Sequence, residues 1–352
     1  PAHYTRKRIR SMGRVSLLAT RATELALEQA GLIDHPALVS GETGIAYGSS
    51  TGSTGPVSEF ATMLTEKHTN NITGTTYVQM MPHTTAVNAG LFFGLRGRVI
   101  PTSSACTSGS QAIGYAWEAI RHGYQNIMVA GGAEELCPSE AAVFDTLFAT
   151  SQRNDAPETS PAPFDHQRDG LVIGEGAGTL ILESLEHAQA RGATIYAELV
   201  GFHTNCDAAH ITQPQRETMQ ICIERALHSA GLTPQQIGYV SAHGTATDRG
   251  DIAESQATAA VFGADTPISS LKSYFGHTLG ACGALEAWMS IEMMREGWFA
   301  PTLNLHQPAA ECGELDYIIG EPRMLETDYI QSNNFAFGGI NTSLIFKRWR
   351  EV

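Results

Sequence analysis

The stretch from Val99 to Gly114 constrains the fold of this chain more than any other. An apolar, β-rich segment gives way to small residues, which lead into a run from Ile113 to Ile120 with apolar residues at helical spacing. The pattern predicts a strand that runs directly into a helix, with Cys106 at the junction.

A cysteine at such a junction is well placed to act as a nucleophile. The first turn of a helix leaves backbone N–H groups unpaired, and its partial positive charge favours a thiolate over a thiol. Small neighbours let a substrate carbonyl approach the backbone, as in the strand, nucleophile and helix elbow of acyl-transfer enzymes. The alternative is a small buried hydrophobic residue, which is the more common role of a free cysteine.

Strands alternate with helices along the chain, which predicts an α/β fold with mostly parallel sheets. A strand over residues 126–135 is expected to break at the glycine pair Gly131–Gly132. The pattern restarts near residue 195, with a strand over 196–200 and a helix over 219–230. We therefore expect one domain built from two similar halves, 1–194 and 195–352.

Composition excludes several classes of function. A net charge of −14 argues against general affinity for nucleic acid. No apolar run is long enough to cross a bilayer and no signal segment opens the sequence, so we expect no membrane contact and a cytoplasmic location. The six cysteines form no disulfide framework and include no Cys-x-x-Cys pair. No phosphate-binding glycine motif is present, and no cofactor is expected.

Two histidines, His243 and His277, each follow an apolar strand and lie beside glycine. Open α/β sheets place their sites at the carboxyl ends of strands. Three such ends carrying Cys106, His243 and His277 favour catalysis over a purely structural role. A zinc-binding module is the alternative, because thiolate and imidazole are also good zinc ligands.

The motifs around these residues closely resemble the active-site motifs of β-ketoacyl-acyl-carrier-protein synthases of the elongating, Cys-His-His type. They are Ser104–Gly109, Ala242–Thr247 and Lys272–His277, and the likeness continues through Phe164–Gly170 and the closing Asn334–Gly339. The resemblance covers nearly the whole chain. It implies the thiolase fold, in which two βαβ-type halves form a five-layered α-β-α-β-α sandwich, and a homodimer or a heterodimer with a homologous subunit.

The resemblance also implies the reaction. Cys106 accepts an acyl chain from carrier protein or coenzyme A as a thioester. Malonyl-acyl-carrier protein then loses carbon dioxide with the support of His243 and His277, and the enolate attacks the thioester to give a 3-oxoacyl chain two carbons longer. Acyl carrier protein, in its acyl and malonyl forms, is thus the expected partner, in fatty acid or polyketide and polyene biosynthesis.

Further roles follow from the same resemblance. The backbone N–H groups of Cys106 and Phe337 form the expected oxyanion hole, and Phe337 is also the expected gate of the pocket. Lys272 and Glu286 are expected to orient the histidine network or, alternatively, to form a buried ion pair. Thr245 and Thr247 are expected to meet the pantetheine arm, and Phe335 and Gly338 to contact the substrate. Lys7 and Arg10, within the basic run Arg6–Arg10, are expected to dock the carrier protein.

Three features depart from the family pattern. Tyr274 and Phe275 stand where the family usually has Thr before the glycine, which predicts an altered pocket. Ala336 replaces the first glycine of the Phe-Gly-Phe-Gly-Gly motif, which predicts a stiffer gate. Together they favour a specialised polyketide or polyene branch, in which a ketosynthase works with a chain-length-factor partner. The family's first strand and helix have no counterpart before Pro1, so we expect an N-terminally truncated chain.

Two relatives of this family fit less well. A chain-length factor keeps the fold but lacks the nucleophile, whereas this chain has Cys106 and both histidines. A degradative thiolase uses a second cysteine near the C-terminus, and no such thiol stands near Asn341.

Overall fold

The computed structural model describes residues 3–351. The chain divides into two compact units. Unit 1 consists of Pro1–Cys137, Glu175–Thr194 and Thr278–Leu285, and unit 2 consists of Pro138–Gly174, Ile195–His277 and Glu286–Val352. Segment 138–174 of the expected N-terminal half thus belongs to unit 2, and the division into halves at residue 194 stays a prediction.

Unit 1 is built around a four-stranded sheet in the order β2-β1-β3-β4. β1 runs parallel to β2 and β3, and β4 runs antiparallel to β3. The strands are β1 (Thr43–Gly48), β2 (Val99–Thr102), β3 (Ile127–Glu134) and β4 (Gly176–Glu183). The helices are α1 (Arg6–Ile9), α2 (Arg14–Gln29), α3 (Gly55–Glu66), α4 (Gly74–Met80), α5 (Thr84–Phe93), α6 (Ser108–Arg121) and α8 (Leu185–Ala190), with short 3-10 turns at Pro36–Leu38 and Leu279–Ala281.

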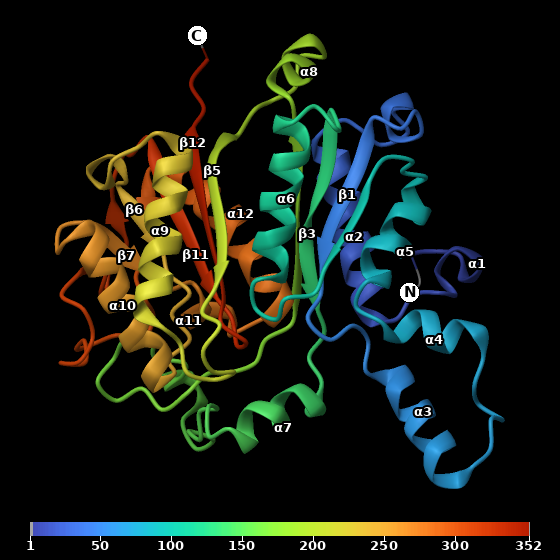
Figure 1. The fold of residues 1–352 in the computed structure, drawn as a ribbon, viewed down its shortest axis with the longest axis horizontal. Coiled ribbons are helices and arrows are strands. Elements are labelled where there is room, and N and C mark those ends of the chain that lie inside the picture. The colour runs from blue at the N-terminus through green and yellow to red at the C-terminus, as the bar shows by residue number, and fades with distance from the viewer. Residues whose placement is uncertain (1–2, 352) are drawn as a thin grey trace. The chain divides into compact units, whose positions relative to one another are not determined.

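The two faces of this sheet carry different residues, and this difference determines the face on which α6 packs. Ile45 and Tyr47 point to the face covered by α2 and α5 and belong to a buried apolar cluster with residues of both helices. The opposite face carries glycine. A Cβ atom added at Gly48 would lie 2.6 Å from the backbone of Ser108, the first residue of α6. The absence of a side chain therefore lets α6 begin directly on the sheet, as its place beside β3 in Figure 1 illustrates.

The expected break at the glycine pair is wrong, because β3 continues through Gly131 and Gly132 to Glu134. Close packing explains both glycines. A Cβ atom at Gly131 would lie 2.1 Å from the carbonyl oxygen of Gly178, and one at Gly132 would lie 2.3 Å from that of Gly280. These residues are needed for backbone contact rather than for a turn.

Unit 2 contains a six-stranded sheet in the order β5-β12-β11-β6-β7-β9 and a small β10-β8 pair. The strands are β5 (Ala197–Cys206), β6 (Tyr239–Ser241), β7 (Pro267–Ser269), β8 (Trp298–Phe299), β9 (Asp316–Tyr317), β10 (Arg323–Met324), β11 (Tyr329–Phe335) and β12 (Ile340–Arg348). The helices are α7 (Pro138–Thr146), α9 (Arg216–Ala230), α10 (Asp248–Phe262), α11 (Lys272–Phe275) and α12 (Cys282–Glu296, whose first residues belong to unit 1), with 3-10 turns at Pro157–Thr159 and Pro234–Gln236.

The second sheet is more mixed than the expected parallel arrangement. β11, β6, β7 and β9 run parallel, but β12 is antiparallel to both of its neighbours. A short turn joins β11 to β12 and makes them a hairpin. The predicted second strand and helix are confirmed as β5 and α9, with longer bounds than expected.

Candidate active site

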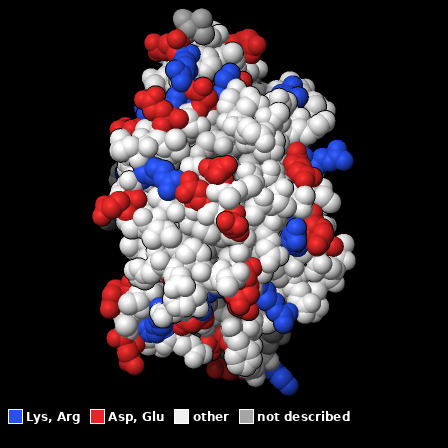
Figure 2. Space-filling model, turned by 90° about the vertical axis from the view of Figure 1, so that its left-hand side faces the viewer, with Lys and Arg blue, Asp and Glu red and all other residues white. Residues whose placement is uncertain are grey.

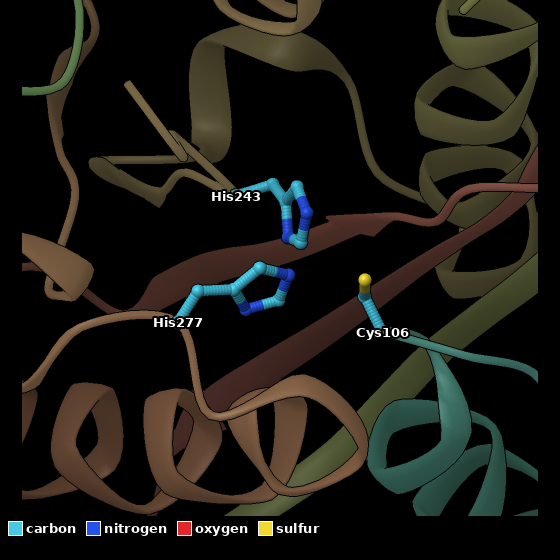
Figure 3. Close-up of side chains that lie close together, drawn as sticks. All are labelled: Cys106, His243 and His277. Carbon is cyan, nitrogen blue, oxygen red and sulfur yellow. The ribbon is translucent and has the colours of Figure 1, made fainter. Parts of the chain in front are cut away.

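Cys106 lies between the end of β2 at Thr102 and the start of α6 at Ser108, so the predicted strand, cysteine and helix arrangement is confirmed. Figure 3 shows its side chain leaving the loop just before the helix. The preceding residue, Ala105, has a φ of 51°, a left-handed conformation that is unfavourable for alanine. Such a turn is typical of a nucleophile elbow.

Hydrogen bonds within the loop hold this conformation. The backbone N–H of Ser104 donates to Oγ of Ser108, and that hydroxyl donates to the carbonyl oxygen of Ala105 at 2.7 Å. The buried thiol of Cys282 donates to the carbonyl oxygen of Cys106 at 3.3 Å. The side chain of Cys106 is itself only 4% exposed. The nucleophile candidate is thus a sheltered thiol on a fixed loop.

His243 and His277 lie together in unit 2. His243 follows β6 by two residues, whereas His277 comes after the short helix α11 rather than directly after β7. Their ring centroids are 5.2 Å apart and the ring planes meet at 88°. Figure 3 shows the two rings side by side. The two predicted histidines are therefore neighbours in one buried place.

The contacts of His243 fix the position of its proton. Nζ of Lys272 lies 3.1 Å from Nδ1, and Nδ2 of Asn334 lies 3.4 Å from the same atom. Ammonium and amide nitrogens are donors, so Nδ1 accepts and the ring proton is on Nε2. Burial, and then the positive charge of Lys272, hold the pKa of both His243 and His277 well below the usual range. Both rings are therefore neutral at physiological pH.

Lys272 and Glu286 form a buried ion pair. Nδ2 of Asn334 donates to the other carboxylate oxygen at 2.6 Å. Burial raises the pKa of Glu286, and the charge of Lys272 opposes that shift. Removing either charge would leave the other buried without its partner, which is costly. The pair is thus a buried ion pair that contacts His243, and its role in orienting that ring stays a prediction.

Two further carboxylates support the loop that carries His243, and the sequence analysis missed both. Glu254 accepts hydrogen bonds from the backbone N–H groups of His243 (2.6 Å) and Gly244 (2.7 Å), and Asp251 accepts from those of Thr245 and Ala246. Burial raises the pKa of Glu254 to about 8 and that of Asp251 to about 6. Their spacing of three residues on α10, just after the histidine motif, is the signal that could have found them.

The residues expected to meet the pantetheine arm lie on this same loop. The hydroxyl oxygens of Thr245 and Thr247 are 2.9 Å apart and share a hydrogen bond. Thr245 is buried and Thr247 is partly exposed. Of the two unusual aromatic residues, Tyr274 points outward, with 47% of its surface exposed and its hydroxyl donating to the carbonyl oxygen of Pro301.

Phe337 lies in the turn of residues 336–339 between β11 and β12, which we call the gate turn. Its ring packs 5.2 Å from that of Phe144. Gly338 and Gly339 both have positive φ angles, and the N–H of Gly338 donates to the carbonyl oxygen of Ile211 at 2.8 Å. Phe335 precedes the gate turn and is buried, with its ring 6.3 Å from that of His243.

The gate turn is also held by Asp207, which the sequence analysis did not single out. The N–H of Asp207 donates to the carbonyl oxygen of Gly339 at 2.8 Å. Its carboxylate accepts from the N–H of Gln215 and from the side chains of Thr218 and Asn341. The loop of residues 207–215 is therefore hydrogen-bonded to the gate turn.

Lys7 and Arg10, the expected docking residues, are exposed at α1 of unit 1. The guanidinium of Arg8 lies 3.7 Å from the ring centroid of Phe92 and donates to its carbonyl oxygen, which anchors the helix. Residues 6–21 contain six Lys or Arg and no Asp or Glu. On the face of the molecule seen in Figure 2, by contrast, acidic and basic side chains are interspersed.

Family comparisons agree with these observations. The family model described as "Beta-ketoacyl synthase, N-terminal domain" matches residues 2–188, and the corresponding C-terminal domain matches residues 196–306. The chain belongs to the β-ketoacyl synthase family. It is 37% identical to the 3-oxoacyl-[acyl-carrier-protein] synthase 2 of Synechocystis over 98% of this chain and 84% of that protein.

Solved structures of the family resemble it closely. A β-ketoacyl synthase from Burkholderia phymatum STM815 is 61% identical and superposes with a TM-score of 0.98 over 99% of this chain and 86% of that one. The ishigamide ketosynthase/chain length factor is 30% identical, with a TM-score of 0.89 over 97% and 83% of the two chains. The expected thiolase-type α/β fold and the acyltransferase class of a ketosynthase are thereby confirmed. Among the described helices, none combines the length and apolarity that a membrane span requires.

Proposed function

We propose that this protein catalyses the decarboxylative Claisen condensation of malonyl-acyl-carrier protein with an acyl thioester on Cys106, giving 3-oxoacyl-acyl-carrier protein. The observation that carries the proposal is the pair of buried, neutral histidines, one of which is held with its proton on Nε2 by Lys272. Neutral N–H donors are what the formation of an enolate from a malonyl thioester requires.

The first half-reaction loads the enzyme. The Cys106 thiolate attacks the carbonyl carbon of the acyl thioester, and the thiol of the carrier's pantetheine arm leaves with a proton. Backbone N–H groups of Cys106 and Phe337 stabilise the tetrahedral oxyanion, as the family resemblance implies. The start of α6 just after Cys106 favours the thiolate.

The second half-reaction extends the chain. The malonyl carboxylate leaves as carbon dioxide, and the electron pair of the broken carbon–carbon bond forms an enolate whose oxygen accepts hydrogen bonds from His243 and His277. The enolate carbon then attacks the Cys106 thioester, and the Cys106 thiolate departs. Each preorganised donor contributes about 3 kcal/mol to such a step. Lys272, Glu286 and the backbone contacts of Glu254 serve by holding the histidines in place.

Substrate contacts are assigned to the loops around these groups. Thr245 and Thr247 present hydroxyl groups to the pantetheine arm, and Phe335 and Gly338 contact the acyl thioester. Phe337 gates the pocket, with the two glycines of the gate turn absorbing the backbone change. The hydrogen bond from the N–H of Asp207 to the carbonyl oxygen of Gly339 holds the gate turn in the conformation described above.

The partner is acyl carrier protein, which is acidic in this family's systems. Lys7 and Arg10 form the docking surface, because unit 2 has 24 Asp or Glu and only 11 Lys or Arg, whereas the charged residues of segment 6–21 in unit 1 are all basic. Such charges act on encounter rate and orientation. The exposed edge strand β2 supports a homodimer or a pairing with a homologous subunit. We assign the protein to the cytoplasm.

A specialised polyketide or polyene pathway, with a chain-length-factor partner, is the second candidate. Ala336 in the gate turn favours it, together with the likeness to the ishigamide ketosynthase/chain length factor. Tyr274 gives it no support, because its side chain points outward. Chain length of the accepted acyl donors separates the two candidates. A series of acyl-carrier proteins with saturated and polyunsaturated chains gives this information directly.

The half-reactions can be measured separately to test the proposal. Wild-type protein with acyl- and malonyl-acyl-carrier protein should release a product two carbons longer. His243→Ala and His277→Ala should retain acyl-enzyme formation and lose condensation. Equal loss of both half-reactions in a folded variant would contradict the assigned role. Stoichiometric zinc in purified wild-type protein, removed by Cys106→Ala, would favour the zinc module instead.

A further inference from the structure

Glu134 at the end of β3 is a buried carboxylate to which the proposed reaction gives no part. It accepts four hydrogen bonds within unit 1. Oγ of Ser49 donates at 2.9 Å, and the backbone N–H groups of Ser50, Thr51 and Gly280 donate at 2.7, 3.2 and 3.0 Å. Its side chain therefore joins the loop after β1 to the segment before α12.

Both of these segments contact the loop that carries Cys106. The N–H of Ser49 donates to the carbonyl oxygen of Thr102, and Oγ of Ser103 donates to that of Ser50 at 3.2 Å. The other segment leads directly into Cys282, the first residue of α12, whose thiol donates to the carbonyl oxygen of Cys106. Glu134 thus reaches the Cys106 loop by two separate routes.

Glycine residues make this close arrangement possible. A Cβ atom at Gly280 would lie 2.6 Å from the backbone nitrogen of Ser50 and 2.7 Å from Oε2 of Glu134. One at Gly109, in the first turn of α6, would lie 2.9 Å from the carbonyl oxygen of Gly280. The segment before α12 is therefore packed tightly between the carboxylate of Glu134 and α6, so a shift of the carboxylate is transmitted to α6.

We infer that Glu134 is a positioning residue for Cys106, which fixes the nucleophile loop through the loop after β1 and through the segment before α12. The inference rests on the proposed function, because it concerns the nucleophile of that reaction. A carboxylate suits the task because each of its oxygens accepts several hydrogen bonds, and all four donors here are N–H or O–H groups. A glutamine at this place would turn its amide hydrogens toward some of these donors.

The chain offers a matched control in the next residue. Glu135 is also a buried carboxylate, and it accepts two hydrogen bonds from Thr54, from the backbone N–H at 2.8 Å and from Oγ1 at 2.6 Å. These bonds hold the start of α3 and do not lead to the Cys106 loop. Glu134→Gln and Glu135→Gln make the same replacement in neighbouring buried places.

The test compares the rate of Cys106 alkylation by iodoacetamide, followed by mass mapping, with thermal stability. We expect Glu134→Gln to slow alkylation at least tenfold and Glu135→Gln to change it less than twofold, with similar losses of melting temperature. The rate of acylation by an acyl-carrier protein should change across the variants in the same way as the rate of alkylation. Equal slowing in both variants, or an unchanged rate in folded Glu134→Gln, would overturn the inference.

A second variant keeps the inference testable if Glu134→Gln fails to fold. Ser103→Ala with Cys282→Ala removes a side-chain contact from each route and leaves the carboxylate in place. We expect at least fivefold slower alkylation of Cys106, and an unchanged rate would overturn the inference. Alkylation needs no ketosynthase chemistry, so a wild-type protein that alkylates normally but never forms an acyl-enzyme would refute the proposed function alone.

Discussion

Replacement of Lys272 by methionine should damage both stability and condensation, for two separable reasons. Lys272 and Glu286 are almost completely buried, at 1% and 0% side-chain exposure. Removing one partner of such a pair costs about 3–5 kcal/mol. With about 2.1 cal/mol/K of unfolding entropy per residue over 352 residues, the melting temperature should fall by about 4–7 °C.

The chemical effect comes from His243. Without the ammonium, only the longer contact of Asn334, at 3.4 Å, keeps the ring proton away from Nδ1, and a ring protonated on Nδ1 no longer donates from Nε2 to the enolate. Loss of one donor lowers the condensation rate by about 100-fold to 1,000-fold. Loading of Cys106 should change far less, because the proposed loading step does not use this donor.

A double variant separates the two effects. Lys272→Met with Glu286→Gln removes the unpaired buried charge, so most of the stability should return while condensation stays lost. Calorimetry gives the melting temperature, and single-turnover assays give the loading and condensation rates. If the double variant regained condensation together with stability, Lys272 would act through folding and not through the proton of His243.

Three further outcomes are expected. Because burial and the charge of Lys272 lower the pKa of His243 and its partner histidine, both rings stay neutral as the pH falls, and the NMR signals of the two rings should show no titration between pH 8 and pH 6; a titration of either ring with a midpoint near 6.5 would contradict this. Ala336→Gly should loosen the gate turn and widen the range of acyl chains loaded, whereas an unchanged range would refute a stiffening role for the methyl group. Lys7→Glu with Arg10→Glu should raise the KM for carrier-bound substrates, most strongly at low salt, and spare small pantetheine thioesters; equal losses with both would remove the docking role.

The strand, cysteine and helix arrangement was predictable because its signal is local. An apolar strand, small residues and a helical run lie next to each other around Cys106, and the structure places the elements in that order. The two histidines were predictable from the strand and glycine context of their motifs. Their closeness to each other was expected from their places after apolar strands, and the family resemblance pointed the same way.

The supporting carboxylates were not predictable in the same way. Glu134 binds backbone N–H groups far away in the sequence, and such contacts leave no pattern of residue types to recognise. Asp251 and Glu254 bind nearby N–H groups, and their spacing after the histidine motif is their signal in the sequence. The glycine pair in β3 was misread for a related reason. Its cause is the backbone of Gly178 and Gly280, which only the folded chain brings close.

The central claim is that Cys106 carries the acyl chain, and intact-mass measurement tests it most directly. Wild-type protein incubated with an acyl-carrier protein should gain the mass of one acyl group, which hydroxylamine removes as expected for a thioester. Cys106→Ala should show no gain, although five other cysteines remain. A thioester mass increase that persists in folded Cys106→Ala protein would contradict the account.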